Sequence, residues 1–181
     1  MINVEATNKM SKKVRLILGD QLNINHSWFQ TIDESITYVL MEIRSETDYA
    51  THHIQKIVGF FSAMRNFASE LQSKNHQVIY YQLNDENNLQ AFDKNIKQLI
   101  DTENFTHFEY QLPDEYRLDE LLKNFYLTLS ISSSVVDSEH FMSSRSELGD
   151  FFEGKKTFLM ESFYHMMRKK HNVLKKKKKP L

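Results

Sequence analysis

The chain of 181 residues contains no cysteine, only four glycines and only two prolines. Without cysteine it cannot form a disulfide, a thiolate metal site, a cysteine nucleophile or a cysteine-bound iron–sulfur cluster. The glycines form neither the G-x-G-x-x-G fingerprint of dinucleotide-binding folds nor the G-x-x-x-x-G-K-S/T loop that binds phosphates. No apolar run approaches the roughly 20 residues that cross a membrane, and the sequence MINVEATNKMSKK lacks the apolar centre of a signal peptide. We therefore expect a cytoplasmic protein with no membrane contact.

A hydrophobic content of 40% lets a chain of this length bury one ordinary globular core. Five short apolar segments, rich in β-branched and aromatic residues, are typical of buried strands. They alternate with segments of helical periodicity, which indicates right-handed crossovers between parallel strands. The prediction is an α/β fold: a Rossmann-like, doubly wound five-stranded parallel sheet with helices on both faces, in a single domain. The predicted strands are Val14–Gly19, Ile36–Ile43, Gln77–Leu83, Thr106–Leu112 and Leu129–Val136.

The stretch from Met41 to Leu71 carries the longest predicted helix. Ser45 with Asp48 three residues later resembles a capping box, so the helix is predicted to begin there. Its apolar residues recur at steps of four and three, which gives one stripe along the helix. Val58, Phe60 and Phe67 widen that stripe, and we expect burial on more than one side. The stripe consists of Ala50, Ile54, Ile57, Phe61, Met64, Ala68 and Leu71.

Charge is distributed unevenly along the chain. From Lys155 onward there are ten Lys or Arg and one acid, which leaves residues 1–154 with a net charge of −10. A basic tail at residues 175–181 suits either nucleic-acid binding or simple solvation of its lysines. The predicted layout is a disordered segment 1–12, an α/β domain 13–142, a connecting segment 143–174 and the lysine-rich tail 175–181.

Polar residues follow four of the predicted strands. In a doubly wound sheet, ligands bind outside the carboxyl ends of the strands, where the winding direction reverses. Each of the four features includes an acid, so the crevice disfavours a bare phosphate and suits a heterocycle or polyol that needs hydrogen-bond acceptors. The structural alternative is a simple turn at Gly19-Asp20 and a favourable helix-start charge at Glu46. The four features are Gly19-Asp20-Gln21, Glu42 with Arg44 and Glu46, Asn84-Asp85-Glu86, and Asp114-Glu115-Tyr116-Arg117.

Two further sequence patterns contain residue types of metal or catalytic sites, but neither predicts such a site. His52 and His53 are predicted to lie on the long helix, where adjacent side chains point about 100° apart and share a metal poorly. Asp137-Ser138-Glu139-His140 contains the residue types of a hydrolase triad, but neighbours in sequence do not form that geometry and no G-x-S-x-G turn is present. No catalytic residue and no metal ligand is predicted.

Several stretches together resemble one family. They are similar to the N-terminal α/β domain of the bacterial photolyase-related proteins, the cryptochrome/photolyase branch that carries an iron–sulfur cluster. The resemblance runs from about Val14 to Leu174. The matching stretches are LILGDQL (16–22), MEIRSE (41–46), YATHH (49–53), FFSAMRNFASEL (60–71), DEYR (114–117) and FMSSRSELGDFFEGKKTFLMESFYHMMRKKHNVL (141–174).

The resemblance implies light-driven DNA repair of six-four pyrimidine photoproducts with FAD. It also implies that the N-terminal domain holds an antenna chromophore, typically 6,7-dimethyl-8-ribityllumazine, at the strand ends. Gly19, Asp20 and Gln21 match the family's first-strand loop, and Glu46 and Tyr49 match its acidic and aromatic residues at the start of the long helix. With Glu42, these residues form the predicted cofactor-binding set.

The chain departs from the family after Leu174. Family members continue into a helical domain with FAD, a 4Fe-4S cluster and a catalytic histidine, whereas this sequence ends after five lysines. We expect a truncated antenna module that has no repair activity alone and meets DNA only through a full-length protein. Two alternatives stay open: a lyase completed by a partner chain that supplies the helical half, and a stand-alone adaptor whose basic tail binds nucleic acid.

Overall fold

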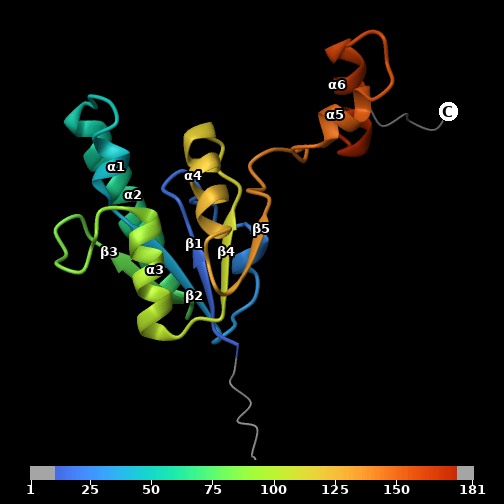
Figure 1. Cartoon of the computed structure of the whole chain (residues 1–181). Coiled ribbons are helices and arrows are strands. Elements are labelled where there is room, and N and C mark those ends of the chain that lie inside the picture. Colours follow the sequence, from blue (N-terminus) through green and yellow to red (C-terminus); the bar gives the residue numbers. More distant parts are fainter. Residues whose placement is uncertain (1–10, 175–181) are drawn as a thin grey trace, which may run out of the picture. The chain divides into compact units, whose positions relative to one another are not determined.

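The computed structural model describes residues 11–174 and divides the chain into two compact units, Met1–Ser138 and Glu139–Leu181 (Figure 1). The prediction for the lysine-rich tail 175–181 therefore lies outside the described residues, and so does the prediction for segment 1–12 apart from residues 11 and 12. Within residues 11–174, no helix is both long and apolar enough to cross a bilayer. The first unit holds the strands β1 (Lys13–Leu16), β2 (Ile36–Met41), β3 (Gln77–Tyr81), β4 (His107–Gln111) and β5 (Ser132–Val136).

All five strands form one parallel sheet in the order β3-β2-β1-β4-β5. The chain winds from β1 outward through β2 to β3, then returns to the other side of β1 for β4 and β5. The winding direction thus reverses between β1 and β4, which makes their carboxyl ends the topological switch point. This arrangement confirms the predicted Rossmann-like α/β fold.

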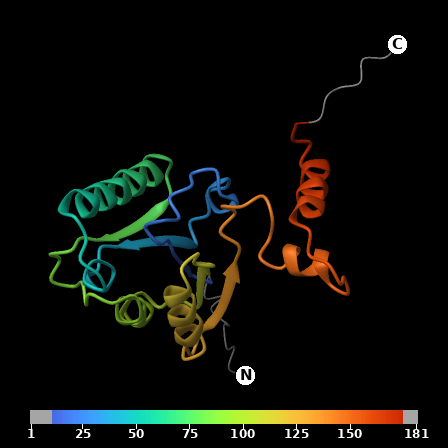
Figure 2. The same cartoon turned by 90° about the horizontal axis from the view of Figure 1, so that it is seen from above.

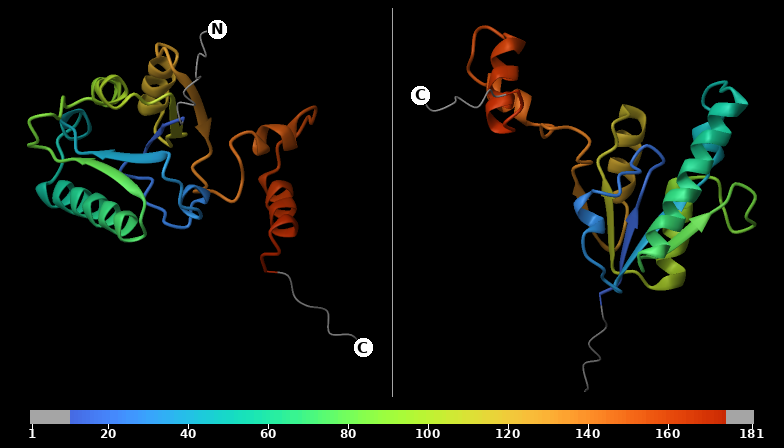
Figure 3. Two further views of the ribbon diagram at one scale, coloured as in Figure 1. Left: turned by 90° about the horizontal axis from the view of Figure 1, so that it is seen from below. Right: turned by 180° about the vertical axis from the view of Figure 1, so that it is seen from behind.

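Helices cover both faces of the sheet, and β2 is apolar on both of its faces. Val39 and Met41 of β2 pack in one core with α3 (Phe92–Glu103) and α4 (Tyr116–Tyr126). Tyr38 and Leu40 of the same strand pack in a second core with α2 (Ile54–Ser73). Figures 2 and 3 show α2 on one side of the sheet and α3 with α4 on the other. The connection from β1 to β2 carries only a short 3-10 helix, η1 (Ser27–Phe29).

The long helix predicted from Ser45 is interrupted. A single turn, α1 (Arg44–Thr47), ends where the Thr47 hydroxyl contacts the Arg44 carbonyl and the Asp48 carboxylate at 3.1 and 2.9 Å. Such local bonds compete with helix continuation. Residues 48–53 are not helical, and α2 begins at Ile54 with His53 as its cap, whose Nδ1 accepts the Gln55 N–H at 3.2 Å. The predicted capping box at Ser45 is wrong.

The apolar stripe of α2 is buried along one face only. Phe61, Met64, Ala68 and Leu71 of the predicted stripe pack on the sheet, and so does Phe67. Ala50 lies outside the helix and Ile54 is 66% exposed, so the predicted start of the stripe is wrong. The expected burial on a second side is wrong, because Val58 is 56% and Phe60 39% exposed. The sheet meets only one face of this helix. Likewise His52 precedes α2 instead of lying within it.

The second unit contains α5 (Glu147–Phe152) and α6 (Met160–Lys170). The two helices meet through aromatic rings, with the Phe151 and Phe163 centroids 5.4 Å apart. Phe158, Leu159 and Tyr164 of this unit are more than half exposed. These three side chains leave an apolar surface on this unit.

Candidate functional site

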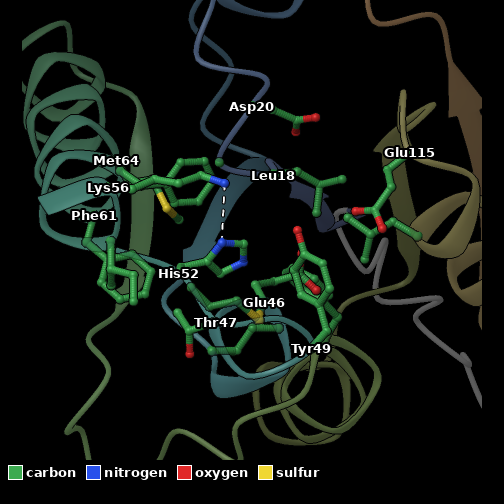
Figure 4. A pocket seen from close by; sticks show the side chains of 17 residues that line it. Leu18, Asp20, Glu46, Thr47, Tyr49, His52, Lys56, Phe61, Met64 and Glu115 are labelled. Atoms are coloured by element: carbon green, nitrogen blue, oxygen red, sulfur yellow. Dashed lines mark hydrogen bonds between the residues drawn. The ribbon is translucent and has the colours of Figure 1, made fainter. Parts of the chain in front are cut away.

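A pocket of about 190 Å³ lies at the carboxyl ends of β1 and β2, next to the switch point (Figure 4). The loop after β1, the α1 turn, residues 48–53, α2 and the start of α4 all contribute to it. Its floor is apolar, and carboxylates from three different segments reach it. The lining consists of Leu18, Gly19, Asp20, Met41, Ile43, Glu46, Thr47, Tyr49, His52, Lys56, Ile57, Phe60, Phe61, Met64, Phe92, Glu115 and Leu118.

Gly19 allows α2 to approach the end of β1. A Cβ at this position would lie 2.4 Å from two ring carbons of Phe60 and 2.9 Å from the Met64 sulfur. Real Cβ atoms do not come so close to neighbouring atoms. A larger residue here would have to displace the Phe60 ring, and Gly19 and Phe60 together form one wall of the pocket.

Arg117 organises the acidic side of the pocket. Its Nη2 donates to both carboxylate oxygens of Glu46 at 3.0 Å, and its Nε donates to Glu115 at 2.8 Å. The guanidinium also lies 4.6 Å from the centre of the Tyr49 ring. Three residues from α1, residues 48–53 and the start of α4 are thereby held together by one cation.

Burial raises the pKa of Glu46 above its ordinary value. The hydrogen bond and charge of Arg117 act in the opposite direction, while the negative charges of Glu115 and Asp20 add to the increase. Burial prevails, so the charged form of Glu46 carries a desolvation cost. A ligand hydroxyl that donates to it would relieve part of that cost.

The segment between α1 and α2 places two rings at the pocket. The rings of Tyr49 and His52 meet edge to face with centroids 5.1 Å apart. His52 Nδ1 lies 3.4 Å from Nζ of Lys56, which is in the first turn of α2. Because the chain leaves the helix here, Tyr49 and His52 both line the cavity.

Gln21 lies outside the pocket lining and has a different set of partners. Its side chain is buried, accepts the Leu18 N–H at 3.0 Å and donates to the Gln111 and Leu112 carbonyls at 3.2 and 3.4 Å. These bonds tie the loop after β1 to the end of β4. Gln21 therefore shapes the switch point from behind the pocket.

Glu42 also lies outside the lining, and its carboxylate is already fully engaged. Arg65 binds it through two hydrogen bonds of 2.6 and 2.9 Å, Tyr80 donates its hydroxyl at 2.7 Å, and the Leu83 N–H donates at 2.9 Å. Burial alone would raise the pKa of Glu42, but these donors outweigh it and hold the pKa below its ordinary value. Glu42 joins β2 to α2 and β3.

The structure thus brings Gly19, Asp20, Glu46 and Tyr49 together and separates them from Gln21 and Glu42. It also adds Lys56 and Phe60, which sequence reasoning did not select for this site. The four-residue spacing of His52 and Lys56 was a signal for their contact. The close approach of the Phe60 ring to Gly19 could not be predicted from the sequence. Within residues 11–174, no three His, Asp or Glu side chains are placed to hold a metal ion.

Comparison with known proteins gives two matches. The family model described as deoxyribodipyrimidine photo-lyase-related protein matches residues 15–181. A (6-4) photolyase from Agrobacterium fabrum is 33% identical over 167 residues, which cover 92% of this chain and 33% of that protein. The chain therefore spans about a third of the length of this curated relative.

Proposed function

The chain belongs to the family of deoxyribodipyrimidine photo-lyase-related proteins, and we propose that its pocket binds an antenna chromophore of the ribityllumazine type. The observation that carries the proposal is the pocket itself. An apolar cavity at the switch point of the sheet has carboxylates from three segments at its edge. Such a cavity provides apolar surface for a heterocycle and acceptors for hydroxyl groups.

Glu46 is the central acceptor in this proposal. It lines the cavity, is held in place by Arg117, and has its pKa raised by burial. The hydroxyls of a ribityl chain are donors that match Glu46 and the nearby Asp20 and Glu115. The same three carboxylates repel a phosphate, so ribityllumazine should bind better than FMN.

The wider role that we propose is light harvesting for DNA repair in the cytoplasm. The curated relative is a (6-4) photolyase, and this chain corresponds to a third of it. FAD, the 4Fe-4S cluster and the contacts with DNA would belong to a helical domain equivalent to the rest of such a protein. Repair activity is therefore not expected from this chain alone.

A fluorescence titration of the purified chain tests the pocket. We expect saturable binding of 6,7-dimethyl-8-ribityllumazine, weaker binding of FMN, and loss of lumazine binding in Glu46→Ala. Glu70→Ala is the matched control, because Glu70 is an exposed acid on α2 away from the pocket lining. A folded wild-type chain that binds no lumazine, or a Glu46→Ala variant that binds normally, would contradict the proposal.

A further inference from the structure

The pocket has charges of opposite sign on different sides. Lys56 is the one Lys or Arg among the lining residues, which also include Asp20, Glu46 and Glu115. The ion pairs near the pocket join Arg117 to Glu46 and Glu115. Among the residues that the structure describes, no ion pair joins Lys56 to a carboxylate, and its hydrogen bond is to His52. Figure 4 draws Lys56 with His52 on the α2 side of the cavity and Glu115 on the other.

His52 contacts the Lys56 ammonium, which is exposed, at 3.4 Å. An ammonium has three donors and no acceptor, so the 3.4 Å contact requires His52 Nδ1 to accept. The imidazole is in turn in edge-to-face contact with the Tyr49 ring, which lies under the Arg117 guanidinium. One ammonium proton points to His52, and the other two are available to a ligand. His52 is thus a positioning residue for Lys56.

We propose that Lys56 selects the ligand by donating to an acceptor atom on the edge of its heterocycle. This inference rests on the proposed function and adds the orientation of the ligand to it. A ribityllumazine has hydroxyl donors at one end and the two carbonyl oxygens of a pyrimidinedione ring at the other. Its hydroxyls match the carboxylate side of the pocket, and its carbonyl edge matches Lys56.

The charge balance of the pocket indicates a neutral ligand edge. Lys56 faces three carboxylates, and Arg117 pairs with the two from Glu46 and Glu115, so two cations stand against three acids and a dianionic phosphate is not favoured. A carbonyl oxygen accepts a charge-assisted hydrogen bond without adding net charge. A cation beside that carbonyl also changes how charge is distributed over the ring, so Lys56 influences the wavelength at which the bound chromophore absorbs.

Lys56→Met tests the proposal with 6,7-dimethyl-8-ribityllumazine as the probe. We expect affinity to fall roughly tenfold or more, because a hydrogen bond to a charged group is lost. The absorption maximum of the bound lumazine should also move. Lys97→Met is the matched control, since Lys97 is an exposed lysine on α3 away from the pocket. It should keep the wild-type affinity and absorption.

Two further variants separate recognition from general damage. Lys56→Arg keeps a cation and should retain most of the affinity, whereas His52→Phe keeps a ring against Tyr49 but removes the acceptor. The latter should shift the absorption maximum and weaken binding less than Lys56→Met does. Wild-type affinity and spectrum in Lys56→Met would overturn this inference and leave the antenna pocket standing. A folded wild-type chain without saturable lumazine binding would overturn both proposals.

Discussion

Replacement of Glu42 by alanine should be among the most destabilising single changes in the sheet-bearing unit. The substitution leaves the Leu83 N–H, the Tyr80 hydroxyl and the Arg65 guanidinium without their shared acceptor. A buried donor that loses its partner costs about 1–3 kcal/mol. Arg65 is half exposed and recovers water, so its share is below about 1 kcal/mol. We expect a total loss of about 3 kcal/mol, which corresponds to a fall in Tm on the order of 10 °C.

Urea unfolding followed by circular dichroism measures this loss, with Glu70→Ala as the control. Glu70 pairs with Lys74 at 2.9 Å, but both side chains are about half exposed, so its removal should cost less than about 0.5 kcal/mol. If Glu42→Ala and Glu70→Ala lose the same free energy of unfolding, the burial of Glu42 does not determine its contribution to stability. The pKa of Glu42 is lowered in the fold, so its stabilisation is present above its ordinary value of 4.5 and is lost as the pH falls through the lowered value. The difference between wild type and Glu42→Ala should therefore shrink in acid.

Three more predictions use the same assays. Glu46→Gln should leave the free energy of unfolding at pH 7 unchanged or raise it by up to about 1 kcal/mol. The pKa of Glu46 is raised in the fold, so the stabilising contribution of the protonated carboxyl is lost as the pH rises through the raised pKa, whereas glutamine stays neutral. The same variant should bind lumazine more weakly, and a large loss of stability would contradict the argument. Gly19→Ala should displace the Phe60 ring and weaken lumazine binding about tenfold while stability changes by less than about 1 kcal/mol; unaffected binding would contradict this. Asn104 ends α3 in the left-handed region, with φ 56°. In urea unfolding, Asn104→Gly should therefore be neutral or stabilising and Asn104→Val should cost about 1 kcal/mol. Equal effects of the two variants would contradict a role for this backbone conformation.

The sheet could be predicted from the sequence because parallel strands buried on both faces are nearly continuous apolar runs. Predicted and observed strands overlap for all five, whereas the strand order, and with it the switch point between β1 and β4, came from the structure. The break before α2 could not be predicted in this way. The apolar stripe continues through Ala50 and Ile54, while the contacts of Thr47 with Asp48 and the cap from His53 decide the outcome.

Glu42 and Glu46 show why the pocket was predicted only in part. Both are acids after the same strand, four residues apart, and nothing in the sequence distinguishes them. Their surroundings come from distant residues: Glu42 meets Arg65 and Tyr80, which are 23 and 38 positions away, and Glu46 meets Arg117, 71 positions away. Local periodicity carries no information about such partners. Only the folded arrangement distinguishes the buried network from the pocket.

The position of β1 in the middle of the sheet has a consequence for synthesis of the chain. β1 is the first strand to be made, and β2 follows within a few tens of residues. Its other neighbour, β4, comes much later, and the Arg15–Glu109 contact between β1 and β4 spans 94 positions. Contacts so distant in sequence form slowly, because a long loop must close before they contribute stability. During translation the open edge of β1 is therefore exposed until β4 has left the ribosome. This edge is the part of the nascent chain at which a chaperone or a second nascent chain would bind.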